Sequence, residues 1–217
     1  MTENQIKIKR LFDIAFSVVG LFLFWPLILI CIVIARIDTR HSGIFTQKRV
    51  GQHGRYFNVH KIRTMTASSG NGGSTVTVVY DPRITRSGAI MRKLKFDELP
   101  QLWNVLLGEM SFVGPRPDVP GYADKLVGEA REILNLRPGI TGPATLCYRD
   151  EEKILAEVND PVTFNDTIIF PDKVRINLNY YQNWSFRLDI VYILVTLKIL
   201  PLAFVPSQSS VEGNICK

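Results

Sequence analysis

The sequence predicts an α+β fold in which an apolar N-terminal helix precedes a compact, mostly helical domain with a small β-hairpin. Three patterns support this: an uncharged apolar run over Ile14–Ala35, strand-type residues on both sides of the turn Gly51–Gly54, and helical spacing of apolar residues from Leu102 onward. The chain has 217 residues, which is enough for one domain with its own core and an accessory segment. We therefore expect two units, residues 1–36 and 37–217.

The apolar run would form a helix about 33 Å long, and that length can cross the hydrocarbon core of a bilayer. A signal peptide is not expected, because the run is long and Arg36–Asp38 is a poor cleavage neighbourhood. A buried helix of a soluble domain is disfavoured by the lack of any polar face. We therefore expect this segment to insert into a membrane.

Two topologies remain open for the inserted segment. Positive charges flank both of its ends, which suits a hairpin with both ends on the cytoplasmic side. Pro26 lies in the middle, where it removes a backbone donor and favours a kink. A kinked helix that spans the bilayer is equally compatible, since membrane helices tolerate proline. The flanking cations are Lys7, Lys9, Arg10, Arg36, Arg40, Lys48 and Arg49.

Local patterns assign the other segments. The last apolar element is compatible with a core helix or with a helix on the membrane surface. The expected elements are a hairpin over Ile44–Met65, a polar loop over Thr66–Thr75, a β-type run over Val76–Tyr80, helical segments at Leu102–Leu106 and Leu126–Leu134, a short helix over Glu151–Val158, an apolar element over Leu188–Val205 and a polar tail over Pro206–Lys217.

The net charge indicates which kinds of partner to expect, and the cysteine content indicates which cellular compartment. The formal net charge of +6 favours nucleic acid, anionic lipid or a phosphorylated substrate. Lys and Arg form no basic run or helical stripe of the kind that binds nucleic acid, so we expect no nucleic-acid partner. Cys31, Cys147 and Cys216 are odd in number and widely spaced, which predicts a reducing compartment and no disulfide framework. The three histidines lack metal-ligand spacing, so we expect no zinc site.

Asp97 and Glu98 precede a proline and an amphipathic helical segment. Aspartate is a favoured N-cap and glutamate suits a first turn, so the dipeptide alone favours a purely structural reading. The same position also suits phosphate binding at a helix N-terminus. One carboxylate could then attack phosphorus while the other binds Mg²⁺ through oxygen.

Arginines in nearby rigid turns favour a catalytic function of Asp97 and Glu98 over a purely structural one. A Pro-Arg-Pro turn restricts the backbone around Arg116, and a guanidinium matches the geometry of a phosphate or a base edge. A plain surface loop would explain any one such turn, and Arg83 could equally face solvent or lipid headgroups. The candidate substrate-binding residues are Arg83, Pro115, Arg116, Pro117, Arg137 and Arg149.

Eight motifs occur in order along nearly the whole chain: Lys9–Asp13, Phe45–Gly51, Lys61–Met65, Asp81–Thr85, Asp97–Leu106, Gly108–Pro117, Arg137–Gly142 and Asn183–Asp189. Any one of them is weak, but the ordered set is specific. Together they resemble the bacterial sugar transferases, the small monotopic phosphoglycosyl transferases that begin undecaprenyl-linked glycan assembly.

The resemblance implies a ping-pong transfer of sugar-1-phosphate from a UDP-sugar to polyprenyl (undecaprenyl) phosphate. Asp97 matches the nucleophile that takes the phosphosugar covalently and releases UMP, and Glu98 matches the ligand of the Mg²⁺ cofactor. Arg116 matches the residue associated with the nucleotide, and Arg149 a phosphate-binding arginine. Asp189 matches a late active-site aspartate.

The resemblance also implies a topology. Residues 1–36 would be a re-entrant helix-break-helix in the bacterial inner membrane, and residues 37–217 a catalytic domain on the cytoplasmic face with surface amphipathic helices. A homo-oligomer is compatible with this arrangement. The chain departs from the family pattern at Trp25-Pro26, where the family has Ser-Pro, at Pro143–Leu146 and in the longer stretch Asp150–Asp172. The last two departures lie where sugar selectivity could reside.

Two other functions are compatible with the residues. A membrane-anchored glycosyltransferase would transfer the sugar without its phosphate and release UDP. A non-enzymatic, membrane-tethered binder of anionic ligands would explain the charge of +6. It would not explain two adjacent carboxylates beside rigid arginine turns.

Overall fold

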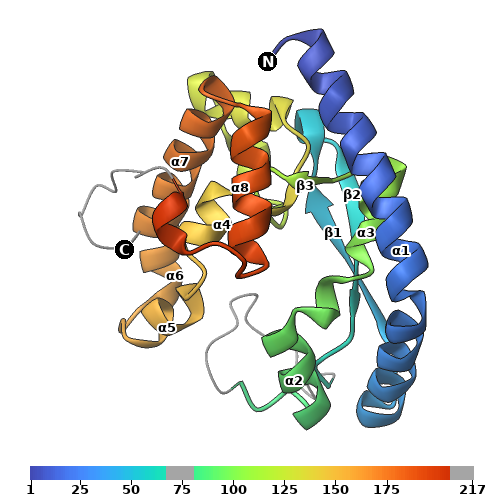
Figure 1. Ribbon diagram of the computed structural model, residues 1–217. Coiled ribbons are helices and arrows are strands. Elements are labelled where there is room, and N and C mark those ends of the chain that lie inside the picture. The colour runs from blue at the N-terminus through green and yellow to red at the C-terminus, as the bar shows by residue number, and fades with distance from the viewer. Residues whose placement is uncertain (67–80, 206–217) are drawn as a thin grey trace.

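The computed structural model describes residues 1–66 and 81–205 (Figure 1). The expectations for the loop after Thr66, for Val76–Tyr80 and for the tail Pro206–Lys217 fall outside these residues. The structure confirms an α+β class with a long N-terminal helix and small sheets. The principal elements are α1 (Glu3–Thr39), β1 (Ile44–Val50), β2 (Tyr56–Ile62), α2 (Arg86–Leu94), α3 (Gln101–Leu107), β3 (Ser111–Val113), β4 (Gly139–Thr141), α4 (Pro143–Cys147), α5 (Glu151–Ala156), α6 (Pro161–Phe164), α7 (Phe170–Gln182) and α8 (Phe186–Thr196).

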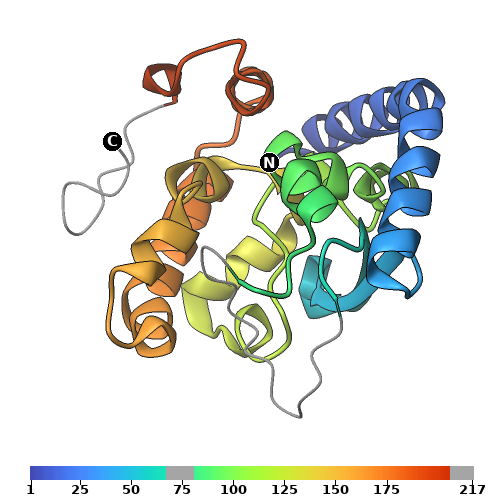
Figure 2. The same ribbon diagram turned by 90° about the horizontal axis from the view of Figure 1, so that it is seen from below.

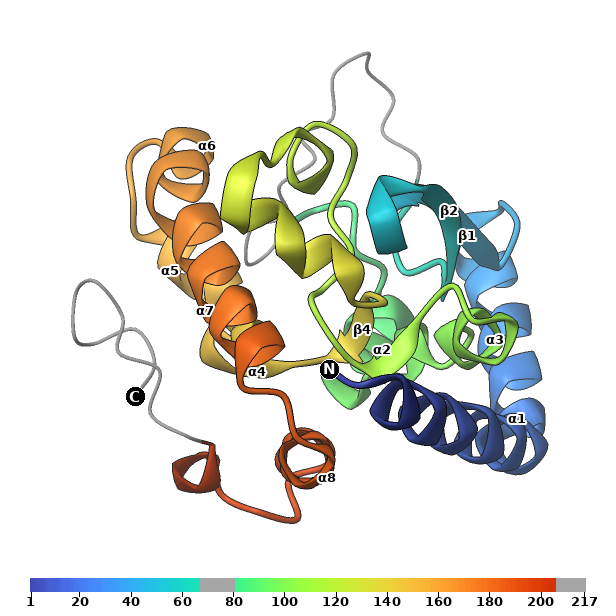
Figure 3. The same ribbon diagram turned by 90° about the horizontal axis from the view of Figure 1, so that it is seen from above.

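Helix α1 begins at a capping box in which the Thr2 hydroxyl accepts from the backbone N–H of Gln5 and the Gln5 side chain accepts from that of Thr2. The helix is assigned without interruption through Pro26, so the chain does not divide there into two separate helices. Figures 2 and 3 nevertheless show that α1 changes direction along its length. Proline is the usual cause of such bends, because it removes one ladder bond and crowds the preceding turn.

The polar and apolar side chains of α1 are arranged in the opposite way to those of a surface helix in a soluble protein. Its buried positions include polar residues four apart, Lys9, Asp13 and Ser17, which face the rest of the chain. Its apolar side chains face outward, and the whole segment Phe22–Pro26 is exposed, with Phe22 at 81%. Only 11% of the most apolar 18-residue stretch is buried. By length and composition α1 is long and apolar enough to cross a membrane, and its outward face suits an apolar medium.

The predicted hairpin is confirmed as the antiparallel pair β1–β2, with Ile44 opposite Ile62 and Val50 opposite Tyr56. Helix α3 packs beside it through the buried Asn104, whose side chain accepts from the backbone N–H of His60 and donates to the backbone carbonyl of Asn58. This amide satisfies backbone groups of a sheet edge that would otherwise be unpaired. It fixes α3 against β2.

A second, parallel pair joins β3 to β4, with Ser111 opposite Gly139 and Val113 opposite Thr141. A core formed by β3, α4, α7 and α8 covers it, and Tyr192 at its centre is 1% exposed. Three expectations need revision. Leu126–Leu134 lies in 3₁₀ turns and not in an α-helix, β3 and β4 were not expected, and the apolar element expected over Leu188–Val205 ends its α-helix at Thr196. The backbone turns there because Lys198 is left-handed (φ 60°) and Pro201 cannot continue a helix.

Helices α1, α2 and α8 lie along one face of the molecule in both end-on views (Figures 2 and 3). Cys31 of α1 is free and buried in a cluster with Ile62 and Met91, which joins α1 to β2 and α2. Cys147 is disulfide-bonded, so the expectation of no disulfide is wrong. Spacing along a chain does not report which sulfur atoms meet in space.

Candidate active site

Asp97 lies in a tight turn between two helices. Helix α2 ends at Lys95, whose backbone is left-handed (φ 60°), and a 3₁₀ turn over Phe96–Glu98 follows. Helix α3 then begins at Gln101 with Pro100 as its N-cap residue and no side-chain cap. The expectation that the acidic pair starts a helix is therefore wrong by one turn, because the proline takes the capping position. Neither carboxylate is used for capping, which removes the structural reading of the dipeptide.

Glu98 is held between two cations from other parts of the chain. Its Oε1 accepts from Arg116 Nη2 at 2.6 Å and from Lys61 Nζ at 3.2 Å. Burial would raise the pKa of Glu98, but the charges of Arg116 and Lys61 outweigh it and hold the pKa well below its ordinary value. Glu98 is 9% exposed, so it is a buried, permanently charged carboxylate.

Asp97 is the opposite case. It is half-buried, and its Oδ1 is buried without a hydrogen-bond partner among the described residues. Burial and the neighbouring negative charge of Glu98 raise its pKa, against the smaller opposing effects of Lys61, Lys95 and Arg92. A buried acceptor without a partner is costly. Such a group is typical of a site that completes its interactions only with a ligand.

The turn that carries Arg116 is clamped from both sides. Pro115 accepts from the backbone N–H of Gly139 at 2.8 Å, and Pro117 accepts from Arg49 Nη1 at 3.0 Å. At Gly114 a Cβ would come within 2.3 Å of a backbone carbonyl oxygen of the facing segment. Only glycine allows this approach. The clamped turn leaves the Arg116 side chain 43% exposed while its Nη2 reaches Glu98.

Two cationic residues in this site were not predicted from the sequence to belong to it: Lys61 had no expected role, and Arg49 was expected only to flank the membrane segment. Lys61 lies on β2 and Arg49 on β1, and the hairpin presents both toward the acidic pair. Burial lowers the pKa of Lys61, although its attraction to Glu98 acts against this shift. Both residues belong to motifs that carry the family resemblance, and a charged residue within an apolar strand was the signal that could have singled them out.

The other predicted arginines lie elsewhere. Arg83 is held by the carboxylate of Asp81, with Nη2 at 2.6 Å from Oδ2. Arg137 donates from Nε to the carbonyl of Gly108 at 3.0 Å, at the opposite end of α3 from the acidic pair. Arg149 is exposed beside Asp150, at 3.7 Å. Within the described part of the chain, the polar partners of these three side chains are Asp81, Gly108 and Asp150, and not Asp97.

Asp189 is buried and its carboxylate is fully engaged. It pairs with Lys9 of α1, and it accepts from Tyr180 Oη at 2.6 Å and from Trp184 Nε1 at 3.1 Å. These partners tie α8 to α7 and to the N-terminal part of α1. The geometry thus gives Asp189 a structural role in holding α1, and its predicted catalytic role stays a prediction.

The donor set around Asp97 fits a magnesium ion. Among residues 1–66 and 81–205, no three His, Cys, Asp or Glu side chains cluster as a metal site. Mg²⁺ does not require such a cage, since it is commonly bound by one or two carboxylates together with substrate phosphates and water. Asp97 and Glu98 supply two adjacent carboxylates, and the unpaired Oδ1 of Asp97 is an oxygen donor without a protein partner.

Comparisons with known proteins identify the family of the chain. Residues 4–202 match the sequence model of a family described as bacterial sugar transferase. The chain belongs to the bacterial sugar transferase family.

Named relatives fall in the same class. The chain is 40% identical over 205 residues to an undecaprenyl-phosphate glucose phosphotransferase of Komagataeibacter xylinus, covering 91% of this chain and 36% of that protein. It is 40% identical over 128 residues to a putative undecaprenyl-phosphate N-acetylgalactosaminyl 1-phosphate transferase of Bacillus subtilis (59% and 72%). A UDP-N-acetylgalactosamine-undecaprenyl-phosphate N-acetylgalactosaminephosphotransferase of Aeromonas hydrophila is 34% identical over 202 residues (91% and 44%). The chain thus spans less than half the length of the first and third.

Proposed function

We propose that this protein transfers a sugar-1-phosphate from a UDP-sugar to a polyprenyl phosphate, with undecaprenyl phosphate as the acceptor and UMP as the leaving product. The observation that supports it most is a pair of adjacent carboxylates. Asp97 has a buried Oδ1 without a hydrogen-bond partner among the described residues, and two cations hold Glu98 in its charged form. The names of the relatives support the acceptor class. Polysaccharide or exopolysaccharide assembly is the process in which such a product would be used.

The proposed chemistry divides the transfer into two displacements. The Asp97 carboxylate attacks the β-phosphorus of the UDP-sugar, forming an aspartyl phosphosugar while the bond to the UMP oxygen breaks. The phosphate oxygen of the lipid then attacks the same phosphorus, and Asp97 leaves as a free carboxylate. Arg116 faces the substrate from a clamped turn, where its guanidinium suits phosphate oxygens.

Magnesium is part of this proposal, with Glu98 as its protein ligand beside the nucleophile Asp97. When bound there, it would supply charge neutralisation for the phosphate oxygens of the donor. The residues of the chain do the positioning: Lys61 and Arg116 keep Glu98 charged, and the turn before α3 directs Asp97. The ion pairs of Glu98 thereby keep a hard anionic ligand ready at low pH as well as at neutral pH.

The membrane arrangement is a separate proposal. We infer that α1 enters and leaves the same, cytoplasmic, face of the inner membrane, with its exposed segment Phe22–Pro26 at the deepest point. Positive flanks on both sides, the change of direction of α1 and the polar contacts of Lys9 and Asp13 support it. Single cysteines placed at Lys7 and Arg40 should both react with an impermeant thiol reagent only from the cytoplasmic side. Labelling of either one from the outside contradicts the hairpin.

The decisive test of the activity is the identity of the nucleotide product. Purified protein in detergent, with Mg²⁺, undecaprenyl phosphate and a panel of UDP-sugars, should release UMP with at least one donor. UDP release would instead identify a glycosyltransferase that leaves the phosphate on the nucleotide. No nucleotide release with any donor, alongside retained vesicle binding, would favour the non-enzymatic binder.

A further inference from the structure

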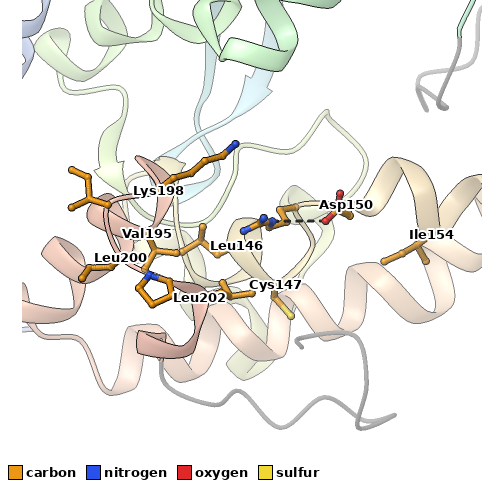
Figure 4. Close-up of a pocket in the computed structure, with 11 residues that line it drawn as sticks. Leu146, Cys147, Asp150, Ile154, Val195, Lys198, Leu200 and Leu202 are labelled. Carbon is orange, nitrogen blue, oxygen red and sulfur yellow. Dashed lines mark ion pairs between the residues drawn. The ribbon is translucent and has the colours of Figure 1, made fainter.

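A groove apart from the Asp97 turn lies between the α4–α5 connection and the end of α8. Its volume is about 670 Å³, within the range of pockets that bind small organic molecules. Figure 4 shows Lys198 extending over the groove from one side, with Asp150 on the other. Its apolar walls are formed by Leu146, Ile154, Val195, Leu200 and Leu202.

Two cations lie at this apolar groove. Arg149 and Lys198 both line it. Among the described residues that line it, Asp150 is the one acid, and it is shared between Arg149 at 3.7 Å and Lys153 at 2.8 Å. An apolar wall lined also by two cations is complementary to an amphiphile with a phosphate head. A phosphate monoester carries up to two negative charges near pH 7, which matches two cations better than the single charge of a phospholipid diester does.

The backbone at Lys198 fixes where its side chain begins. Its φ is 60°, a left-handed conformation of the kind that commonly ends helices, and Lys95 ends α2 in the same way. The turn is held because Lys198 donates its N–H to the carbonyl of Val195 at 3.0 Å and Ile199 donates to that of Leu194 at 2.9 Å. The lysine side chain therefore leaves the end of α8 from a fixed position beside the groove.

The position of the groove connects it to both the lipid and the reaction. It borders the face shared by α1, α2 and α8 (Figures 2 and 3), where Leu197 and Ile199 are each 64% exposed. Its Arg149 end leads directly into α5. There Glu152 pairs with Arg92 at 2.7 Å, and Arg92 is one of the cations that act on the Asp97 carboxylate.

We propose that this groove binds the isoprenoid chain and phosphate of the lipid acceptor, with Lys198 and Arg149 on the phosphate. This rests on the proposed function for the identity of the acceptor. The apolar walls take the first part of the hydrocarbon chain as it leaves the bilayer, and the two cations hold the phosphate at the end of the groove nearest α5. A phosphodiester lipid fits less well, since it has half the charge and two chains.

The test measures binding without any donor sugar, so it does not depend on turnover by Asp97. Full-length protein in detergent is irradiated with a diazirine-bearing polyprenyl phosphate, and the adducts are mapped by peptide mass spectrometry. Adducts are expected on residues 146–154 and 195–202, and undecaprenyl phosphate should suppress them. Undecaprenol and phosphatidylglycerol at the same concentration should not. Adducts confined to α1, or equal suppression by phosphatidylglycerol, would overturn the assignment.

A matched pair of variants sharpens this test. Lys198→Gln should weaken competition by undecaprenyl phosphate at least about fivefold, while Lys93→Gln, which removes an exposed cation from α2, should leave it unchanged. In the full reaction, Lys198→Gln should raise KM for the lipid and leave KM for the donor as it was. Equal effects of both variants would reduce the role of Lys198 to general surface charge and refute the proposal. Loss of UMP release with unchanged crosslinking would count against the proposed function and leave the groove standing.

Discussion

The acidic pair Asp97–Glu98 and the buried Asp189 were both expected to act in catalysis, yet their surroundings differ. Asp189 has three partners and joins three helices. Within the described residues, Asp97 has a buried oxygen with no hydrogen-bond partner, beside a glutamate that two cations hold in its charged form. A carboxylate whose hydrogen-bonding capacity is filled by the protein stabilises the fold. One that is buried and left incomplete is available to a ligand.

An unpaired oxygen is not sufficient by itself. Asp13 also has a buried Oδ2 without a partner, but its Oδ1 accepts from the Ser111 hydroxyl and from the backbone N–H of Phe112, both at 3.1 Å. Asp13 therefore ties α1 to β3, much as Asp189 ties α1 to α8. What distinguishes Asp97 is the combination of an unpaired oxygen, a charged neighbouring carboxylate and two cations within the same site.

The largest effect that would test this contrast is expected from Asp97→Asn. Asparagine keeps the size of the side chain, and no cap or ion pair is lost, so the protein should fold and bind membranes as before. Transfer should fall by at least about 10³-fold, because an amide is not a nucleophile toward phosphorus. Wild-type protein incubated with UDP-sugar and no acceptor should carry a phosphosugar adduct by intact-protein mass spectrometry, with the modified peptide containing Asp97. An adduct on another residue, or an active variant, contradicts the assignment.

Asp189→Asn should lower the stability of the protein and leave its activity nearly unchanged, the reverse of what is expected for Asp97→Asn. It leaves the buried Lys9 ammonium without its counter-charge, which should lower the free energy of unfolding by about 3 kcal/mol. Thermal unfolding in detergent measures this loss. The variant that remains folded should release UMP at close to the wild-type rate per molecule. If activity falls by orders of magnitude while the melting temperature is unchanged, Asp189 has a catalytic role and the contrast between the two sites fails.

Glu98→Gln should have an intermediate effect on the reaction. The amide is a poor ligand for Mg²⁺ and leaves Lys61 and Arg116 without their shared anion. A loss of roughly 10- to 100-fold is expected at limiting Mg²⁺, partly recovered when Mg²⁺ is raised. Wild-type rates at limiting Mg²⁺ would exclude Glu98 as a metal ligand. A Glu109→Gln variant provides a control, because that carboxylate binds Asn104 on α3 and lies outside the proposed site.

Local patterns account for what the sequence predicted. The hairpin and α3 follow from apolar periodicity and turn residues within a short window, and α1 follows from its uncharged run. The pair β3–β4 was missed because each strand has three residues, too few for a period, and gains its stability from the core around Tyr192. The 3₁₀ turn at Asp97 was missed because a left-handed Lys95 and a capping Pro100 displace the start of α3.

The candidate site, like the fold, could be predicted only in part from local sequence patterns. Asp97, Glu98 and Arg116 were assigned through the family resemblance, and the structure brings Glu98 and Arg116 together. Lys61 lies 37 residues from Glu98 in the chain, so no spacing rule connects them. Arg137 was expected near substrate because it stands in a glycine- and proline-rich turn, yet its guanidinium binds a carbonyl at the far end of α3. A turn motif indicates a rigid backbone and not the direction of its side chain.

The smallest expected effect is a shift in the pH dependence of the first half-reaction. Attack requires the deprotonated Asp97, and burial together with the charge of Glu98 raises the pKa of Asp97. The rate of adduct formation should therefore fall as pH decreases through a pKa above the ordinary value for aspartic acid, about 3.9. Glu98 remains charged throughout this range because its own pKa is lowered, so it does not contribute a second acidic limb.

Two variants should move this limb in opposite directions. Glu98→Gln removes the negative neighbour that raises the pKa of Asp97, so its acidic limb should move to lower pH. Lys61→Gln removes a positive charge that lowers the same pKa, so its limb should move to higher pH. Adduct formation is measured by rapid quench between about pH 4 and about pH 8, where a raised carboxyl pKa would lie. These rates give the position of each limb, even where the variants are slow. Limbs that move together would mean that the observed titration belongs to a group other than Asp97.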